Sequence, residues 1–398
     1  MLLFLLFFAG VELLVLICSF FRSPNKYWPV FAVLAAFVGF RNYGGVDDIN
    51  FSNLQAGGYI NSFYLFKRIG DQIFSYSSWE SSYYFFCKLA LSLHMSYKAV
   101  FLIYAVLTYF FLYLAFRVLC KTRTEWLLAI GSYQCFCLIT GLSLMRQSLA
   151  MAMILYAVTL IMSLKWKKAF IIWLLACVIH NAALFAIIIF ILFSPKVKIH
   201  RLAKALVPPV CYLLGVSGAV NAVILQLSWI FPAKYQIYLN NYKLNQFGVT
   251  QSAGLLSAVF FIIYLMQLVL GYNSSRKGDG EEPSKYLRQQ TVHAEVAVTG
   301  NCTDILERGE GLYLSLYFVA LSSGAATRVS ILFIVFTAFL LNTFLSHFPK
   351  ADKQVLGIVM MALLVIYYVY ELSVLPQNIA QMIYPYHWST NLFADFIR

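Results

Sequence analysis

The sequence predicts an all-α, multi-pass membrane protein, and three features of its composition support this prediction. Of 398 residues, 61% are hydrophobic and only 11% are charged, and the mean hydropathy is +0.76. These values are typical of polytopic helical membrane proteins and not of soluble domains. The apolar runs are continuous and do not alternate with period two, which argues against a transmembrane barrel. We therefore expect a single transmembrane domain over 1–398.

Apolar runs separated by charges or turn residues predict about ten full spans, since a helix needs roughly 20 apolar residues to cross a bilayer. The predicted spans are 1–21, 27–40, 98–118, 126–141, 147–164, 205–230, 252–271, 312–327, 329–346 and 354–375. The first run has no basic residues before it, so it is predicted to be a transmembrane helix and not a cleaved signal.

Basic residues give these spans an orientation. The formal net charge is +13, but the lysines and arginines stand in short clusters between apolar runs, a pattern that indicates a cytoplasmic side and no nucleic-acid partner. The predicted cytoplasmic clusters are Arg22/Lys26, Arg117/Lys121/Arg123, Lys165/Lys167/Lys168, Lys196/Lys198/Arg201/Lys204 and Lys350/Lys353. The same rule places the loop region 41–97 at the outer face and the polar loop 272–311, which has no assigned chemistry, in the cytoplasm.

The apolar stretch 169–194 has basic clusters at both ends, so it is not expected to cross the membrane once. We predict a broken re-entrant hairpin with arms 169–179 and 182–194, which meet at His180-Asn181. The alternative is a single helix that departs from the charge rule. Broken intramembrane helices tend to line a cavity or bind a ligand at the break.

Four isolated residues that carry or can take a positive charge lie within or beside apolar runs: Arg41, Arg146, His180 and Arg328. Such residues are costly to place in hydrocarbon, so they usually face a partner, a cavity or a ligand. The predicted topology brings all four to the outer face, where together they would form an anion site. The alternatives are a salt bridge, a snorkelling side chain or a helix–helix contact for each residue taken alone.

Carboxylates follow Arg41 closely. Tyr43 and the Gly44-Gly45 pair, which permits a tight turn, precede Asp47 and Asp48. A carboxylate beside the arginine would serve as a general base or would orient the guanidinium. Adjacent aspartates also occur in metal sites, but no further ligands have suitable spacing, and no metal is predicted.

Two other positions favour phosphate and proton chemistry. Arg146 and Gln147 open a predicted helix that runs to 164. A cation in the first turn of a helix adds to the positive helix end, which favours a bound anion there. His180 can shuttle a proton or donate to a phosphate. Signatures of soluble hydrolases and of nucleotide-driven pumps are missing from the sequence.

At these residues the chain resembles the EpsG/Wzy class of bacterial polysaccharide polymerases. The resemblance is carried by Gly39-Phe40-Arg41, Gly45-Val46-Asp47, the run Met145 to Ala150, the run His180 to Leu184, Arg328 and Tyr384-Pro385-Tyr386. It implies a glycosyltransferase of the inner membrane that joins undecaprenyl-pyrophosphate-linked repeat units at the periplasmic face. The product would be O-antigen or exopolysaccharide, as in lipopolysaccharide biosynthesis.

The resemblance also implies roles for the residues above. Arg41, Arg146 and Arg328, with Gln147 and Tyr43, would bind the pyrophosphate. Asp47, Asp48 or His180 would deprotonate the acceptor, with no metal and no cofactor. The partners would be a lipid-linked donor, a lipid-linked acceptor and a chain-length regulator protein. The alternatives are an O-antigen ligase and, in another class, a flippase for lipid-linked oligosaccharides, which would need charges through both leaflets and an internal repeat.

Overall fold

The structure is a computed structural model that describes residues 2–43, 58–75, 81–226, 251–277, 302–322, 324–374 and 387–388. The chain divides into two compact units. Unit 1 contains Met1–Tyr156, Ile171–Leu184 and Met361–Arg398, and unit 2 contains Ala157–Phe170 and Phe185–Met360.

The described part of the chain is helical, as predicted, apart from one short strand pair. Strand β1 (Arg41–Tyr43) pairs antiparallel with β2 (His387–Trp388). Among the described residues, four helices are long and apolar enough to cross a membrane, and four shorter apolar helices accompany them. The all-α class is thus confirmed, whereas the total of ten spans stays a prediction.

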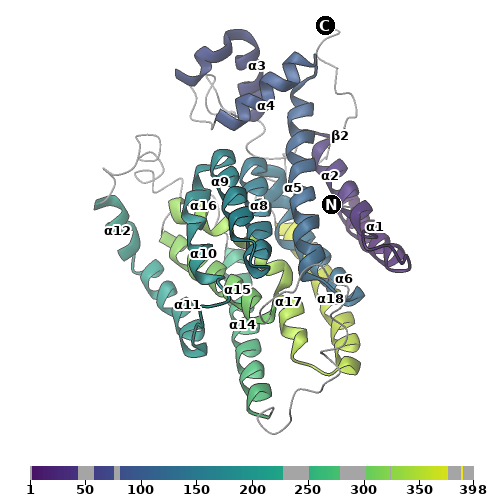
Figure 1. Cartoon of the computed structure of the whole chain (residues 1–398), viewed down its shortest axis with the longest axis vertical. Coiled ribbons are helices and arrows are strands. Elements are labelled where there is room, and N and C mark those ends of the chain that lie inside the picture. Colours follow the sequence, from purple (N-terminus) through teal and green to yellow (C-terminus); the bar gives the residue numbers. More distant parts are fainter. Residues whose placement is uncertain are drawn as a thin grey trace. The chain divides into compact units, whose positions relative to one another are not determined.

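Unit 1 is built on α5, against which α2 packs, while α1 packs on α2 and α6; Figure 1 shows α1 next to α2. Its principal helices are α1 (Leu2–Ser19), α2 (Trp28–Gly39), α5 (Tyr97–Leu119), α6 (Arg123–Phe136), α7 (Leu138–Ser143) and the first part of α8 (Met145–Met162). Local signals start two of them. Ser96 caps α5, and Thr122 with Glu125 forms a capping box at α6, which satisfies backbone N–H groups that a helix start leaves open.

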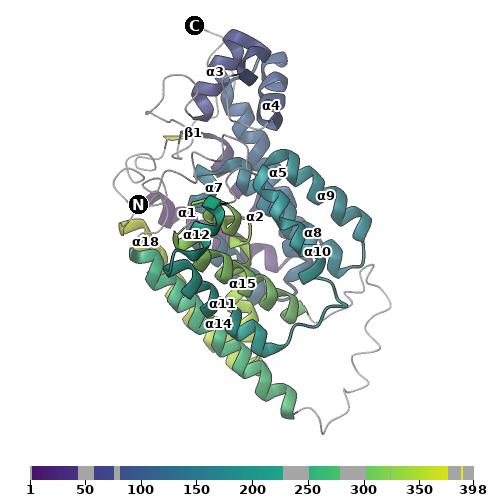
Figure 2. The same cartoon turned by 90° about the vertical axis from the view of Figure 1, so that its left-hand side faces the viewer.

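Part of the predicted outer loop 41–97 is helical. Helices α3 (Tyr59–Ile69) and α4 (Ser81–Ser92), with the 3₁₀ segment η1 (Gly70–Ser75), form a pair that Figure 2 shows side by side. Helix α3 buries Tyr59, Phe63 and Phe66. These residues recur at i, i+4 and i+7, which is the period of one helix face. The segment was predicted as loop because both helices are short and carry polar residues on their other faces.

The stretch 169–194 folds back on itself at His180. It consists of α9 (Trp166–Ile179), the 3₁₀ segment η2 (Asn181–Ile188) and α10 (Ile189–Leu192). The Trp173 Nε1 donates to the Ala183 carbonyl at 2.9 Å, although ten residues of a continuous helix would span about 15 Å. Farther from the break, the rings of Phe170 and Phe190 lie 5.9 Å apart. The segment therefore does not form a single continuous helix. That the hairpin is re-entrant in a membrane stays a prediction.

Unit 2 is centred on α15 (Cys302–Val319), which contacts α11 (Arg201–Val216), α14 (Gln251–Lys277) and α17 (Thr337–Ser346). Figure 2 shows α11, α14 and α15 together. The remaining described elements are α12 (Ala219–Gln226), η7 (Ala320–Ser322), α16 (Gly324–Ile331), η8 (Ile334–Phe336) and α18 (Lys350–Val374), whose second half belongs to unit 1.

Two predictions for unit 2 need correction. The predicted span 205–230 is interrupted between α11 and α12, where Gly218 has φ +70°, a conformation that ends a helix and favours glycine. The predicted polar loop 272–311 is helical at both ends, because α14 extends to Lys277 and α15 begins at Cys302. Residues 278–301 lie outside the described part.

Candidate functional site

Unit 1 buries two of the predicted arginines. Arg41 follows the end of α2 with 0% of its surface exposed, and its Nη1 donates to the Val38 carbonyl at 2.8 Å. That bond serves one of the carbonyls that the last turn of α2 leaves without an intrahelical partner. Arg146 lies in the first turn of α8, as predicted, and is 8% exposed. Both guanidinium groups are thus held inside the protein.

An aromatic frame connects the two guanidinium groups. The Arg41 Cζ lies 4.3 Å from the Phe101 ring centroid, and the Arg146 Cζ lies 5.4 Å from that of Tyr59. The Tyr59 and Phe101 rings pack edge to face at 6.3 Å. Ring faces attract cations within about 6 Å. The Met145 Sδ also lies 4.0 Å from the Arg41 Nη2, so the residue that precedes Arg146 touches Arg41.

Tyr59 contacts Arg146 by its hydroxyl as well as by its ring. The Arg146 Nε donates to the Tyr59 Oη at 3.2 Å. In turn the Tyr83 hydroxyl of α4 donates to the Tyr59 carbonyl at 2.5 Å, and the two rings lie 5.3 Å apart. The helical pair α3–α4 therefore places Tyr59 against the first turn of α8.

A small cavity lies beside Arg41 and is lined by hydroxyl groups. Its polar lining consists of Arg41, Tyr104, Thr108, Tyr109, Tyr133 and Ser148. The cavity offers about 10 Å³, which is room for one water molecule. The Tyr133 hydroxyl donates to that of Tyr109 at 3.4 Å. Arg41 thus borders a polar pocket in otherwise apolar surroundings.

The break at His180 is tied to the same part of unit 1. Ser82 of α4 donates to the carbonyl of Ile179, the last residue of α9, at 3.3 Å. Ser82 also lies next to the Tyr104 hydroxyl, which borders the cavity of Arg41. The backbone of His180 turns by accepting from the Ala183 N–H at 2.9 Å, and the residue is partly exposed.

The other predicted site residues are placed in part. Gln147 follows Arg146 in α8 and is 2% exposed. Tyr43 lies in β1, where its backbone pairs with His387, and its side chain is outside the described residues. Asp47 and Asp48 also lie outside the described residues. Arg328 lies in α16 of unit 2 and is partly exposed, so the structure does not relate it to Arg41 and Arg146.

Tyr59 and Phe101 were missed in the sequence because nothing set them apart there. The chain contains 27 tyrosines and 35 phenylalanines, and an aromatic residue at helical spacing predicts only a buried face. Their contacts with the arginines become visible only once α3 and α5 are packed together.

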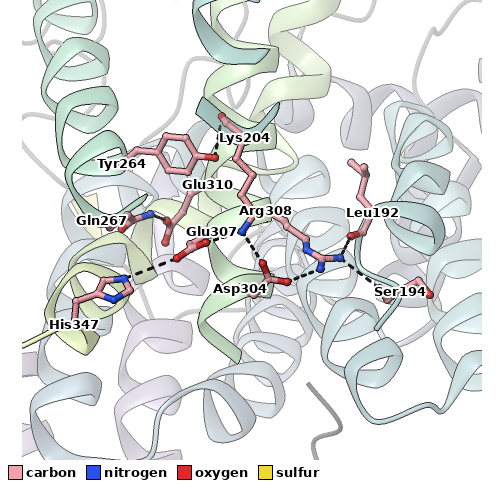
Figure 3. Close-up of polar contacts among 10 residues, drawn as sticks. All are labelled: Leu192, Ser194, Lys204, Tyr264, Gln267, Asp304, Glu307, Arg308, Glu310 and His347. Carbon is pink, nitrogen blue, oxygen red and sulfur yellow. Dashed lines mark hydrogen bonds and ion pairs between the residues drawn. The ribbon is translucent and has the colours of Figure 1, made fainter. Parts of the chain in front are cut away.

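Unit 2 contains a second polar cluster that the sequence did not predict (Figure 3). The Lys204 Nζ of α11 lies 2.6 Å from both the Asp304 Oδ1 and the Glu307 Oε2. Arg308 pairs with Asp304 and donates to the Leu192 carbonyl at 2.8 Å, which lies at the end of α10. These contacts join three helices through the buried Lys204, Glu307 and Arg308 and the half-buried Asp304.

Glu310 extends this cluster toward α14 and α17. Its carboxylate accepts from the Gln267 amide and, at 2.9 Å, from the Thr343 hydroxyl, while the His347 Nε2 lies 3.8 Å from the Glu307 Oε1. The acidic residues Asp304, Glu307 and Glu310 are spaced by three, which places them along one side of α15. This spacing in the sequence could have indicated the cluster, but the three residues fall in the segment 272–311, which was predicted to be a loop. In the described part of the chain no three His, Cys, Asp or Glu side chains are grouped to hold a metal ion.

These features define an α-helical, multi-pass membrane protein with a pair of buried guanidinium groups. The chain belongs to the EpsG family, whose model matches residues 26–388. The matched range includes Arg41, Arg146, His180 and Arg328, and membership indicates a Wzy-like polymerase of polysaccharide biosynthesis. No curated protein and no solved structure matches the chain significantly.

Proposed function

We propose that this protein polymerises oligosaccharide repeat units linked to undecaprenyl pyrophosphate, at the periplasmic face of the bacterial inner membrane. O-antigen or exopolysaccharide would be the product. The observation that carries the proposal is the pair Arg41 and Arg146, which are 0% and 8% exposed and share one aromatic frame. Family membership supplies the class of reaction.

The guanidinium pair suits a leaving pyrophosphate. When the acceptor hydroxyl attacks the anomeric carbon, the bond to the pyrophosphate oxygen breaks and negative charge builds up on the leaving group. Fixed donors in a site of low dielectric stabilise such charge without reorganising, and an arginine binds phosphate oxygens through its planar fork. The two arginines supply this charge without a metal ion.

The remaining roles follow the predicted assignments. Gln147, Tyr43 and Arg328 would add contacts to the pyrophosphate. The proton of the acceptor hydroxyl would pass to Asp47, Asp48 or His180. Ser82 of α4 binds the carbonyl of Ile179, the residue before His180, which holds the backbone at the break against unit 1.

The proposal is tested by the surface polysaccharide of a deletion strain that carries plasmid-borne variants. Arg146→Ala should remain in the membrane at normal abundance and yield glycans of a single repeat. The matched control is Arg68→Ala, which removes an exposed arginine of unit 1 and should give normal chain-length ladders. A normal ladder from Arg146→Ala would rule the proposal out. Lipid A core without any repeat in the deletion strain would instead identify a ligase, and repeat units trapped in the cytoplasm would identify a flippase.

A further inference from the structure

We infer that Tyr59 is a positioning residue that orients Arg146 toward the diphosphate of the lipid-linked donor. The inference rests on the proposed function, because it assigns Arg146 to that diphosphate. Tyr59 lies on α3, in a region that the sequence predicted as loop, and it is 1% exposed. It therefore acts through Arg146 and does not present its own hydroxyl to solvent.

The hydroxyl of Tyr59 fixes the rotation of the Arg146 guanidinium. Arginine carries five N–H donors in a rigid plane, and here the Nε–H donates to the Tyr59 Oη at 3.2 Å. The edge formed by the two terminal nitrogens of a guanidinium can bind two phosphate oxygens at once, and a bond at Nε orients that edge. Loss of the Tyr59 hydroxyl would remove this restraint on the guanidinium plane.

The ring of Tyr59 also connects the surroundings of the two cations. It packs against Phe101 at 6.3 Å, and Phe101 lies beneath Arg41 at 4.3 Å. Two like charges in an apolar interior repel each other, and the packed rings of Tyr59 and Phe101 help to hold both guanidinium groups in place. Pre-organised groups of this kind avoid the cost of ordering on binding.

Tyr59 is itself held by the helical pair. The Tyr83 hydroxyl donates to its carbonyl at 2.5 Å, and the Tyr83 side chain is 0% exposed. This bond connects α4 to the first residue of α3, so Tyr59 is held by a contact from a second helix in addition to the backbone bonds of its own helix. The orientation of Arg146 is therefore set through two successive contacts, from Tyr83 to Tyr59 and from Tyr59 to Arg146.

The test uses the full chain purified in detergent, with inorganic pyrophosphate as the probe and thermal unfolding as the readout of binding. Tyr59→Phe keeps the ring and removes the hydroxyl. It should weaken pyrophosphate binding roughly tenfold, the order expected for one hydrogen bond to a charged group. Tyr64→Phe is the matched control, since Tyr64 lies on the same helix and is 39% exposed. Its affinity should equal that of the wild type.

A double-variant cycle separates positioning from a general loss of structure. If Tyr59 acts through Arg146, adding Tyr59→Phe to Arg146→Lys should cause no further loss of affinity. The inference would be overturned if the double variant lost affinity by the product of the two single losses. It would also be overturned if Tyr59→Phe bound pyrophosphate as tightly as the wild type. Should Tyr59→Phe unfold, Tyr83→Phe provides the second variant, which weakens the anchor and should also lower affinity. Unchanged affinity in a folded Tyr83→Phe would contradict the account.

Polymerisation by the same variants in proteoliposomes separates this inference from the proposed function. With a lipid-diphosphate oligosaccharide as substrate, Tyr59→Phe should raise KM for the donor more than it lowers kcat. Polymer formation with the same KM in Tyr59→Phe and wild type would overturn the inference and leave the proposed function standing. Weakened pyrophosphate binding in Tyr59→Phe, with no polymer from wild type, would overturn the proposed function alone.

Discussion

Arg41 and Arg146 are both buried, and each guanidinium group contacts an aromatic ring and a polar atom of the described residues. Arg41 meets a carbonyl, a thioether and a ring face, and Arg146 meets a phenol by its edge and by its face. Such contacts depend on the planar shape of the group and not on its charge alone. At the residue scale, shape should therefore matter as much as charge.

Replacing Arg41 by lysine should test this point. Lysine keeps the charge but loses the flat group that lies on Phe101, and it has no fork for two phosphate oxygens. We expect Arg41→Lys to lower polymer formation by about tenfold or more at unchanged membrane abundance, as for the loss of one oriented donor. Arg68→Lys, the same exchange at an exposed position, should leave the ladders unchanged. Equal ladders from both variants would show that charge suffices at position 41.

At the scale of elements, α2 must lie close to α5 for Arg41 to reach Phe101. Gly39 makes this approach possible, because a Cβ atom there would lie 2.8 Å from the Leu102 Cδ1 and 3.0 Å from the Leu102 Cα. The second neighbour is backbone and has little freedom to move. Gly39 thus determines how closely the end of α2 is placed against α5.

Gly39→Ala should push α2 away from α5 and lower the unfolding temperature by a few degrees, since overpacking costs about 1–3 kcal/mol. Polymer length should fall with it, because Arg41 follows two residues later. Gly10→Ala in α1 is the control, since a Cβ there meets nothing within 4 Å. An unfolding temperature of Gly39→Ala equal to that of Gly10→Ala would mean that the contact is not tight.

The ionic cluster of unit 2 connects the helices α10, α11 and α15. Burial alone would raise the pKa of Asp304, but Lys204 and Arg308 outweigh that effect and hold the pKa below its usual value. A carboxyl whose folded pKa is lowered stabilises the fold above its ordinary pKa and loses this contribution as pH falls through the lowered value. Acidification should therefore loosen the contact between α11 and α15.

Removing the lysine should expose this dependence. Lys204→Met leaves two carboxylates without their shared cation, and breaking a buried pair on one side costs about 3–5 kcal/mol. We expect a markedly lower unfolding temperature at neutral pH and a smaller further decrease on acidification than in the wild type. Lys198→Met, an exposed lysine nearby in the sequence, should behave like the wild type. Similar pH curves for both variants would contradict the role given to Lys204.

The sequence predicted those elements whose apolar runs are long and continuous, such as α5 and α8, to within a few residues of their ends. It did not predict α3 and α4, because short helices with one polar face lack the composition of a span. The break at Gly218 was also missed, since the apolar run continues through it. Likewise Arg146 was expected in a first turn, but Tyr59 as its partner follows only from packing between distant segments.

At the scale of the whole molecule, the proposal requires the outer face to be periplasmic. Labelling of single cysteines by a membrane-impermeant maleimide, after replacement of the eight native cysteines, tests this. Ser92→Cys at the end of α4 should react from the periplasmic side of intact cells, and Lys168→Cys in α9 should react only after the membrane is opened. Both positions are exposed. The reverse pattern would move the site to the cytoplasmic face.

Reconstitution tests the central claim most directly. Wild-type protein in proteoliposomes, supplied with one lipid-diphosphate-linked repeat unit, should produce a ladder of longer glycans and release one lipid diphosphate for each glycosidic bond formed. Arg146→Ala should produce neither the ladder nor the lipid diphosphate, whereas Arg68→Ala should match the wild type. A wild type that forms no bond between repeat units, or an Arg146→Ala variant with the wild-type ladder, would contradict the account.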